Sequence, residues 1–220
     1  MVNNQEELLL AKIAELEKLH IVHIREIAIE EALEKVRART MAMQQSNELA
    51  ETALQLFQQL QDLGFSFWRT GFYIWKKEEG LVQGWTSNGE LTGILQPILF
   101  PWKEDEGHNA IYESSLNGES VWEQYLDGEA LKKHYEWMLS SSTNATSFSQ
   151  LKDAGVSLPE KQYKYASIFK QGYLMVIATE PQPQMNDLLK RFARVFEQCY
   201  TRFIDLRREI YERGFLLFTV

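Results

Sequence analysis

Two histidines three positions apart, His20 and His23, are the first residues whose type and spacing could do chemistry. On a helix they would lie one turn apart on one side, where they could share a metal ion. Either histidine could also accept a phosphoryl group. No further histidine or cysteine stands nearby in the sequence to complete a metal site, and no glycine-rich ATP-binding motif accompanies the pair. We therefore expect neither a metal site nor a phosphoacceptor here.

A dense group of titratable residues follows in the middle of the chain: Glu104, Asp105, Glu106 and His108. An enzyme would need acids, bases or nucleophiles that converge on one point. Because this segment is turn-like, we expect its side chains to be solvated. His108 and His134 each stand alone in the sequence and are interpreted as helix-surface or supporting residues. We predict no catalytic residue, metal or cofactor, and keep an unrecognised enzyme as an alternative.

The single cysteine, Cys199, excludes an intrachain disulfide, a CxxC redox pair and a cysteine-based zinc cage. This usage is typical of a reducing compartment, so we expect a cytoplasmic protein. The formal net charge of -8 argues against nucleic-acid binding, which needs clustered lysine and arginine. The first residues lack the basic flank and small-residue cleavage site of a signal peptide, and no apolar run approaches the length of a membrane span. We expect no nucleic acid and no membrane insertion.

Helical periodicity dominates the first part of the chain. From Glu6 to about Met43, apolar residues recur three or four positions apart, with charged residues between them. The rest of the chain is too small to cover so long an apolar stripe, which favours a coiled coil with a second copy. His20, Glu26 and Thr40 interrupt any single heptad frame. One or two helices folding back on the domain therefore stay as an alternative.

Two further helices are predicted on the same grounds. One begins after "QQSNEL", where Ser46 or Asn47 can cap it, and ends at Gly64. The other is the long amphipathic segment "QMNDLLKRFARVFEQCYTRFIDLRREIYERG", which should end at Gly214. The uncharged tail after it should fold back and bury its apolar residues. These residues are Phe215, Leu216, Leu217 and Phe218.

The middle of the chain alternates and is rich in aromatics, as strands are. "FSFWRTGFYIWKKEEGLVQGWTS" predicts a hairpin, and "YKYASIFKQGYLMVIAT" predicts two more strands around "KQG". "LTGILQPILFPW" predicts a strand at a sheet edge because of Pro97 and Pro101. Short helices are expected to close at Gly118 and to begin near Asp127. "SSSTNATSFSQLKDAGVSLPEK" predicts a long surface excursion.

With this order of elements the chain resembles a GAF-type sensory domain, of the kind that precedes a histidine kinase or other output region in bacterial two-component signalling proteins. The resemblance covers roughly Ile29 to Glu209. It rests on "EEALEKVRARTMAMQQSNELAETALQLFQQLQDLGF", "FWRTGFYIW" and "KYASIFKQGYLMVIATEPQPQMNDLLKRFARVFEQCYTRFIDLRRE". It implies an α+β fold in which a GAF-like antiparallel sheet is flanked by helices, with long N- and C-terminal helices on one face and a ligand pocket on the other.

The resemblance also implies a division of the chain and a set of partners. Residues 1–44 would be an N-terminal signalling and dimerisation helix, residues 45–213 the sensory domain with its C-terminal helix, and residues 214–220 an apolar tail. We expect a homodimer through the terminal helices, a small-molecule ligand, and a kinase or other output domain as a partner. The alternative is a structural dimerisation module without ligand.

The pocket face of such a domain would be covered by aromatic residues of this chain. The candidate ligand-binding residues are Tyr73, Trp85, Trp102, His108, Tyr112, Trp122 and Tyr125. We expect Trp85, Trp102 and Tyr112 to point into one partly enclosed cavity, although these side chains could also fill the pocket themselves. "NATSFSQLKD" lacks the signature of the cyclic-nucleotide-binding branch. Cys199 stands in the final helix, so neither sulfoxide reduction nor bilin attachment is expected.

Overall fold

The structure is a computed structural model, and it describes residues 2–45, 48–87, 97–140, 149, 153 and 155–217. For residues 2–4 and 210–217 it describes the backbone alone. The helices are α1 (Val2–Met41), α2 (Leu49–Asp62), α3 (Glu106–Leu116), α4 (Gly128–Ser140) and α6 (Met185–Leu217), with 3-10 turns η2 (Lys77–Glu79) and η3 (Trp102–Glu104). The strands are β1 (Arg69–Lys76), β2 (Leu81–Ser87), β3 (Ile98–Pro101), β4 (Val121–Asp127), β5 (Lys161–Phe169) and β6 (Gly172–Ala178).

The strands form one antiparallel sheet in the order β3-β2-β1-β6-β5-β4. The predicted α+β class, with a sheet flanked by helices and long terminal helices, is confirmed. Strand β3 lies at one edge of the sheet, which is the position that Pro97 and Pro101 predict. Strand β4, at the other edge, was not predicted, because "VWEQYLD" contains three acidic or amide residues and its partner β5 lies far along the chain.

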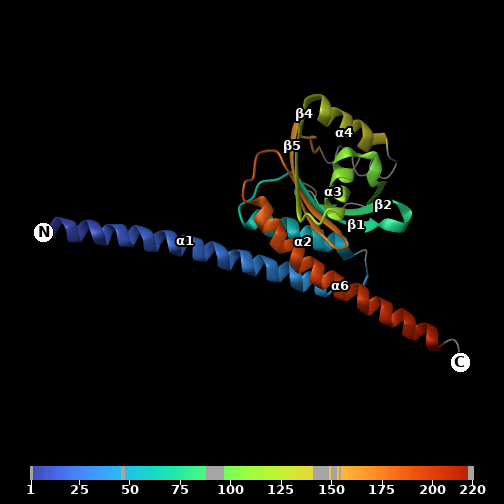
Figure 1. The fold of residues 1–220 in the computed structure, drawn as a ribbon, viewed down its shortest axis with the longest axis horizontal. Coiled ribbons are helices and arrows are strands. Elements are labelled where there is room, and N and C mark those ends of the chain that lie inside the picture. The colour runs from blue at the N-terminus through green and yellow to red at the C-terminus, as the bar shows by residue number, and fades with distance from the viewer. Residues whose placement is uncertain are drawn as a thin grey trace.

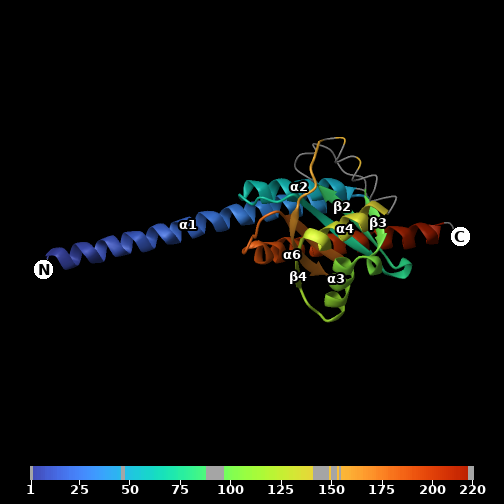
Figure 2. The same cartoon turned by 90° about the horizontal axis from the view of Figure 1, so that it is seen from above.

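The sheet lies between two helical layers (Figure 1). On one side α2 and α6 contact the strands, and α1 packs against both helices from outside. On the other side α3 and α4 cover the sheet. Figure 2 shows the same layers from above, with the two ends of the chain pointing away from the domain in opposite directions. We refer to the two sides of the sheet as the α2/α6 face and the α3/α4 face.

Strand alternation assigns each side chain to a face. On β1, Phe72 and Ile74 join the core on the α2/α6 face, whereas Tyr73 and Trp75 join the core on the α3/α4 face. On the α2/α6 face the ring of Phe72 stacks on Phe196 of α6, with ring centroids 3.9 Å apart. Each such buried ring contributes about 1.5–3 kcal/mol, so this contact ties α6 to the middle of the sheet.

Helix α1 has two parts with different surroundings. Residues 5–27 are exposed throughout, and Figure 1 shows the part before Arg25 standing clear of the rest of the molecule. From Ala28 onward the apolar side chains of the helix pack on the domain, with Leu33 and Val36 buried against α2 and α6. The predicted long N-terminal helix is confirmed, while pairing with a second copy stays a prediction. No described helix is long and apolar enough to cross a membrane.

Two helix-end predictions have different outcomes. Helix α2 is followed by Gly64 at φ 83°, the left-handed backbone expected of a glycine that ends a helix. Helix α6, in contrast, continues through Gly214 to Leu217, so the predicted end at Gly214 is wrong. A glycine inside a helix costs only about 1 kcal/mol and need not stop it. The caps Ser46 and Asn47, Phe218, and the side chains of the remaining tail residues lie outside the described part.

Candidate functional site

The α3/α4 face carries a cluster of packed aromatic rings. Trp75, Trp102 and Tyr112 contact one another, with Trp102 and Tyr112 stacked at a centroid distance of 4.6 Å. Trp122 packs against the same core. These rings pack on one another and occupy the space between them. This packing favours the alternative in which the aromatics fill the pocket themselves, which stays a prediction.

Two of the seven candidate residues lie elsewhere. Trp85 belongs to the core on the α2/α6 face, because it pairs with Phe72 and shares that strand position's orientation. Tyr125 is 48% exposed at the sheet edge, where its ring packs on Tyr163. The prediction that Trp85, Trp102 and Tyr112 point into one cavity is wrong, since the alternation of β2 directs Trp85 away from the other two.

Of the remaining two candidates, His108 belongs to a group of buried polar side chains, and Tyr73 lies beside that group. We call this group the polar cluster; it consists of Arg69, Asp105, His108, His134, Lys164 and Tyr173. Its members come from β1, β5, β6, α4 and the start of α3. The sheet and both covering helices therefore meet at these side chains.

Asp105 organises the cluster at the N-terminus of α3. Its Oδ1 accepts a hydrogen bond from the backbone N–H of His108 at 2.8 Å, which caps the helix. Its Oδ2 lies 2.7 Å from Nδ1 of His134. Burial alone would raise the pKa of Asp105, but the hydrogen bond from His134 and the charge of Lys164 outweigh it and hold that pKa well below its usual range. The expected solvation of Asp105 and His108 is wrong, because both are buried.

His134 connects Asp105 to Lys164. Nζ of Lys164 lies 3.1 Å from Nε2 of His134, so a charged lysine donates to a neutral imidazole whose Nδ1–H donates to Asp105. Burial lowers the pKa of Lys164 to about 8, and burial with the charge of Lys164 lowers the pKa of His134. The charges of Lys164 and Asp105 therefore compensate each other through His134.

His108 makes the contact with the central strand. Its Nδ1 lies 2.5 Å from the hydroxyl of Tyr173 on β6, and the ring of Tyr173 stacks on Tyr73 at 4.8 Å. Burial lowers the pKa of His108 to about 3 and raises the pKa of Tyr173 well above its usual value. Both groups are therefore neutral near pH 7.

Arg69 is the member for which the described residues supply no ion-pairing carboxylate. It is 2% exposed, and among the described residues no carboxylate forms an ion pair with it. One guanidinium nitrogen donates to Oγ1 of Thr86 at 2.6 Å, while Nε has no hydrogen-bond partner within that part of the chain. Burial lowers the pKa of Arg69. A buried cation in this position is costly unless an anion accompanies it.

A small enclosed cavity of about 20 Å³ lies within the polar cluster, lined by Arg69, Tyr73, His108, His134 and Lys164 among others. This volume suits a group about as large as one water molecule. His134 also lines an open groove of about 400 Å³ on the outside, together with Glu129 and Lys133. His134 therefore separates the inner cavity from the surface.

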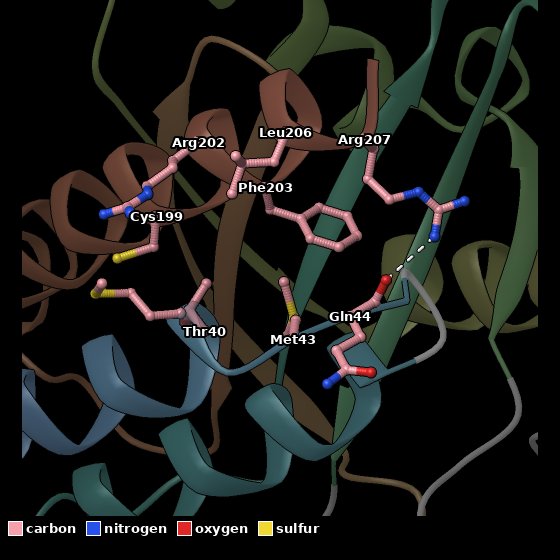
Figure 3. A pocket seen from close by; sticks show the side chains of 9 residues that line it. Thr40, Met43, Gln44, Cys199, Arg202, Phe203, Leu206 and Arg207 are labelled. Atoms are coloured by element: carbon pink, nitrogen blue, oxygen red, sulfur yellow. Dashed lines mark hydrogen bonds between the residues drawn. The ribbon is translucent and has the colours of Figure 1, made fainter. Parts of the chain in front are cut away.

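A second open groove lies in the other helical layer, between the end of α1 and α6. It measures about 390 Å³ and is lined by Thr40, Met41, Met43, Gln44, Cys199, Arg202, Phe203, Leu206 and Arg207. Figure 3 shows the side chains of α6 facing those at the end of α1, and the hydrogen bond of Arg207 to the Gln44 carbonyl at 3.1 Å. Cys199 is buried here, and burial raises its pKa.

Sequence reasoning missed Arg69, Lys164 and Tyr173 and treated Asp105 and His134 as solvated or isolated. A usable signal was present for the two cations. Arg69 and Lys164 interrupt "FWRTGF" and "YKYASIF", aromatic strands in which a charged residue takes an inward position. A single charged residue at such an inward position indicates a buried charge, and buried charges are common at functional sites. The pairing of Asp105 with His134 has no such local signal.

The comparisons with known proteins add little to this geometry. No protein-family model matches the chain, and no curated protein matches it. Among solved structures it is similar to the crystal structure of the A. aeolicus nlh2 GAF domain in an inactive state, at 11% identity and a TM-score of 0.45. That match covers 83% of this chain and 99% of the other. A likeness of this size assigns neither family nor ligand; the fold and cluster define an α+β domain with a buried, charged site on its sheet.

Proposed function

We propose that the chain is a non-enzymatic sensory or regulatory module of the GAF type in bacterial signal transduction, dimeric through its terminal helices, and that the polar cluster binds a small anion. The observation that carries the ligand proposal is Arg69, buried beside an enclosed cavity without an ion-paired carboxylate among the described residues. Chloride matches the size of the cavity, and nitrate would need a modest expansion. The cytoplasmic location stays a prediction from the single cysteine.

A regulatory role is favoured over catalysis by the way the cluster is occupied. Both oxygens of Asp105 and both ring nitrogens of His134 are already engaged within the protein. A general acid or base needs one such atom directed at a substrate. The cluster is better arranged to hold charge than to move it.

A physical route connects the cavity to the helices. Tyr73 faces the cavity, and its neighbour Phe72 stacks on Phe196 of α6 on the opposite face. A ligand that shifts β1 by a small amount would press on α6, and a few kcal/mol of bias is enough to shift a two-state packing. This series of contacts supports coupling between the cavity and α6.

The test is ligand binding in a buffer whose only anions are large organic ones. Adding chloride, bromide or nitrate should stabilise the protein by about 2.7 kcal/mol at 100 times the dissociation constant, measured by urea unfolding. Arg69→Gln should abolish the response, whereas Lys133→Gln, at an exposed lysine of the outer groove, should retain it. Equal stabilisation by sulfate, or a response that persists in Arg69→Gln, would overturn the anion site.

The second candidate is a structural dimerisation module without ligand. It is favoured by the packed rings of Trp75, Trp102 and Tyr112, which fill their own part of the face. In that case the 20 Å³ cavity holds water, and none of the anions changes stability beyond the general effect of salt.

A further inference from the structure

The exposed part of α1, residues 5–27, carries a regular seam. Along this part of the helix, one set of residues is spaced alternately by four and by three positions, which is the spacing of the a and d sites of a coiled coil. They are occupied by Leu9, Ile13, Leu16, His20, His23 and Ile27. All six are exposed in one copy of the chain, although no lysine, arginine or carboxylate stands at any of them. The polar positions of this seam are therefore two adjacent histidines.

The flanking positions agree with a second copy in parallel orientation. Leu10, Leu19 and Ile24 fall on the adjoining e and g sites and widen the apolar seam. Lys12 falls on a g site and Glu17 on the following e site, so each Lys12 would face Glu17 of the second copy with opposite charge. Charge complementarity thus supports a second copy over an unrelated apolar partner.

The seam is also free to be covered. The residues that bury α1 on its own domain, such as Leu33, Val36 and Thr40, lie on the roughly opposite side of the helix when 3.6 residues make a turn. A second α1 could therefore dock on the seam without displacing the domain. Beyond Ile27 the same side carries Glu30 and Glu34, which are exposed, so the apolar seam ends where the domain begins.

We propose that two copies pair in parallel through this seam, and that His20 and His23 of both copies together bind one transition-metal ion of the Zn²⁺ class. The metal site rests on the dimer of the proposed function. One copy cannot form it alone, because the described residues of a single chain contain no group of three metal-ligating side chains. Two copies bring four imidazoles to neighbouring layers, the number and type of ligand that Zn²⁺ accepts in tetrahedral sites.

Without a bound metal ion, the two histidines would destabilise the coiled coil. Polar side chains inside a coiled-coil seam cost stability and are kept where they set register or bind something. Four imidazoles in adjacent layers weaken the apolar contact between the copies, and a shared metal ion offsets this loss. Metal binding and dimerisation are therefore the same equilibrium, in the way that metal binding and folding are in small metal-dependent domains.

The test uses untagged full-length protein, because a histidine tag would itself bind metal. Sedimentation equilibrium in EDTA and in Zn²⁺ should show that Zn²⁺ at 100 times its own dissociation constant tightens dimerisation about 100-fold. Calorimetric titration should give one ion per two chains. A stoichiometry of one ion per chain, or binding that leaves dimerisation unchanged, would overturn the site.

Matched variants separate the site from the dimer. His20→Leu with His23→Leu should dimerise more tightly than the natural sequence in EDTA and lose the zinc effect, because leucine suits both seam positions. Glu15→Ala with Lys18→Ala, outside the seam, should change neither property. If the natural sequence dimerises with the same affinity in EDTA and in Zn²⁺, the metal site is refuted but the dimer is not. If the protein is monomeric in every condition, the dimer is refuted as well. Unchanged dimerisation of the double leucine variant would show that the histidines are not in the seam.

Discussion

His108 shows how burial sets the response of this protein to pH. Its pKa is lowered by burial from an ordinary 6.5 to about 3, so the unfolded chain takes up a proton at a pH where the folded chain does not. Stability from this group is complete above pH 6.5 and is lost as the pH falls toward 3. The pKa of His134 is lowered in the same direction. Asp105 stays ionised throughout this range.

From this difference we predict that acidification from pH 7 to pH 5 lowers the free energy of unfolding by about 2 kcal/mol through His108 alone. His108→Gln should reduce the pH-dependent loss by about that amount, measured by urea unfolding in EDTA at one protein concentration. Tyr173→Phe is the matched control, since it removes the hydroxyl bonded to His108 but leaves the histidine. It should lose stability equally at both pH values. An unchanged pH dependence in His108→Gln would contradict the assignment.

The polar cluster shows how far a site can be predicted from residue types alone. Tyr73 and His108 were selected from the sequence and do line the cavity, while ligand binding by them stays a prediction. The link from Asp105 through His134 to Lys164 could not be foreseen, because it joins an N-cap, a helix and a strand that come together only in the fold. Sequence spacing describes neighbours on one element, and this cluster contains few of them.

At the scale of elements, two kinds of contact attach α1 to α6. One is exposed: Arg191 pairs with Glu26 and Glu30, the latter at 2.6 Å. The other is buried: Leu33 lies in the core with 3% of its surface exposed. Exposed ion pairs add little because water solvates the separated charges nearly as well, whereas a deleted buried side chain leaves a cavity.

We therefore predict that Leu33→Ala lowers the free energy of unfolding by about 2–5 kcal/mol, and that Arg191→Ala lowers it by clearly less. Chemical denaturation of both variants at the same protein concentration makes the comparison. Both residues lie in the contact between α1 and α6, so the difference between their losses of stability reflects burial and not location in the fold. Equal losses would mean that the ion pairs, and not the apolar contact, attach α1 to the domain.

Elements with a strong local pattern were predictable. The period of α2 and α6, and the hairpin of β1 and β2 around Gly80, appear in the sequence as they do in the structure. Strand β4 was not predicted because its alternation of apolar and polar residues is weak and its partner β5 follows only after α4. Trp85 was assigned to the wrong face for a related reason: a shift of one position along a strand reverses the side chain, and the sequence does not show which face is which.

For the molecule as a whole, the remaining question is what the projecting part of α1 contributes. The helix begins to touch its own domain at Arg25, where the guanidinium donates to the carbonyl of Leu63 at 3.0 Å and lies over the ring of Phe65. Residues before it make no burial contact within the described part of one copy. An isolated helix of this length with so many exposed apolar side chains is marginal in water, which argues that it is covered in solution.

The chain shortened to residues 25–220 therefore separates the two roles of α1. We predict that it keeps the folded domain, with the aromatic near-UV circular dichroism of the full chain, because the core from Ala32 onward is intact. We also predict that it is monomeric, or dimerises far more weakly, because the seam from Leu9 to Ile24 is gone. Sedimentation equilibrium over a range of concentrations measures this. The matched control is a shortening that removes only residues 1–4, which leaves the seam in place and should preserve the dimer. If residues 25–220 dimerise with unchanged affinity, the contact between copies belongs to the domain or α6, and the projecting helix needs another partner.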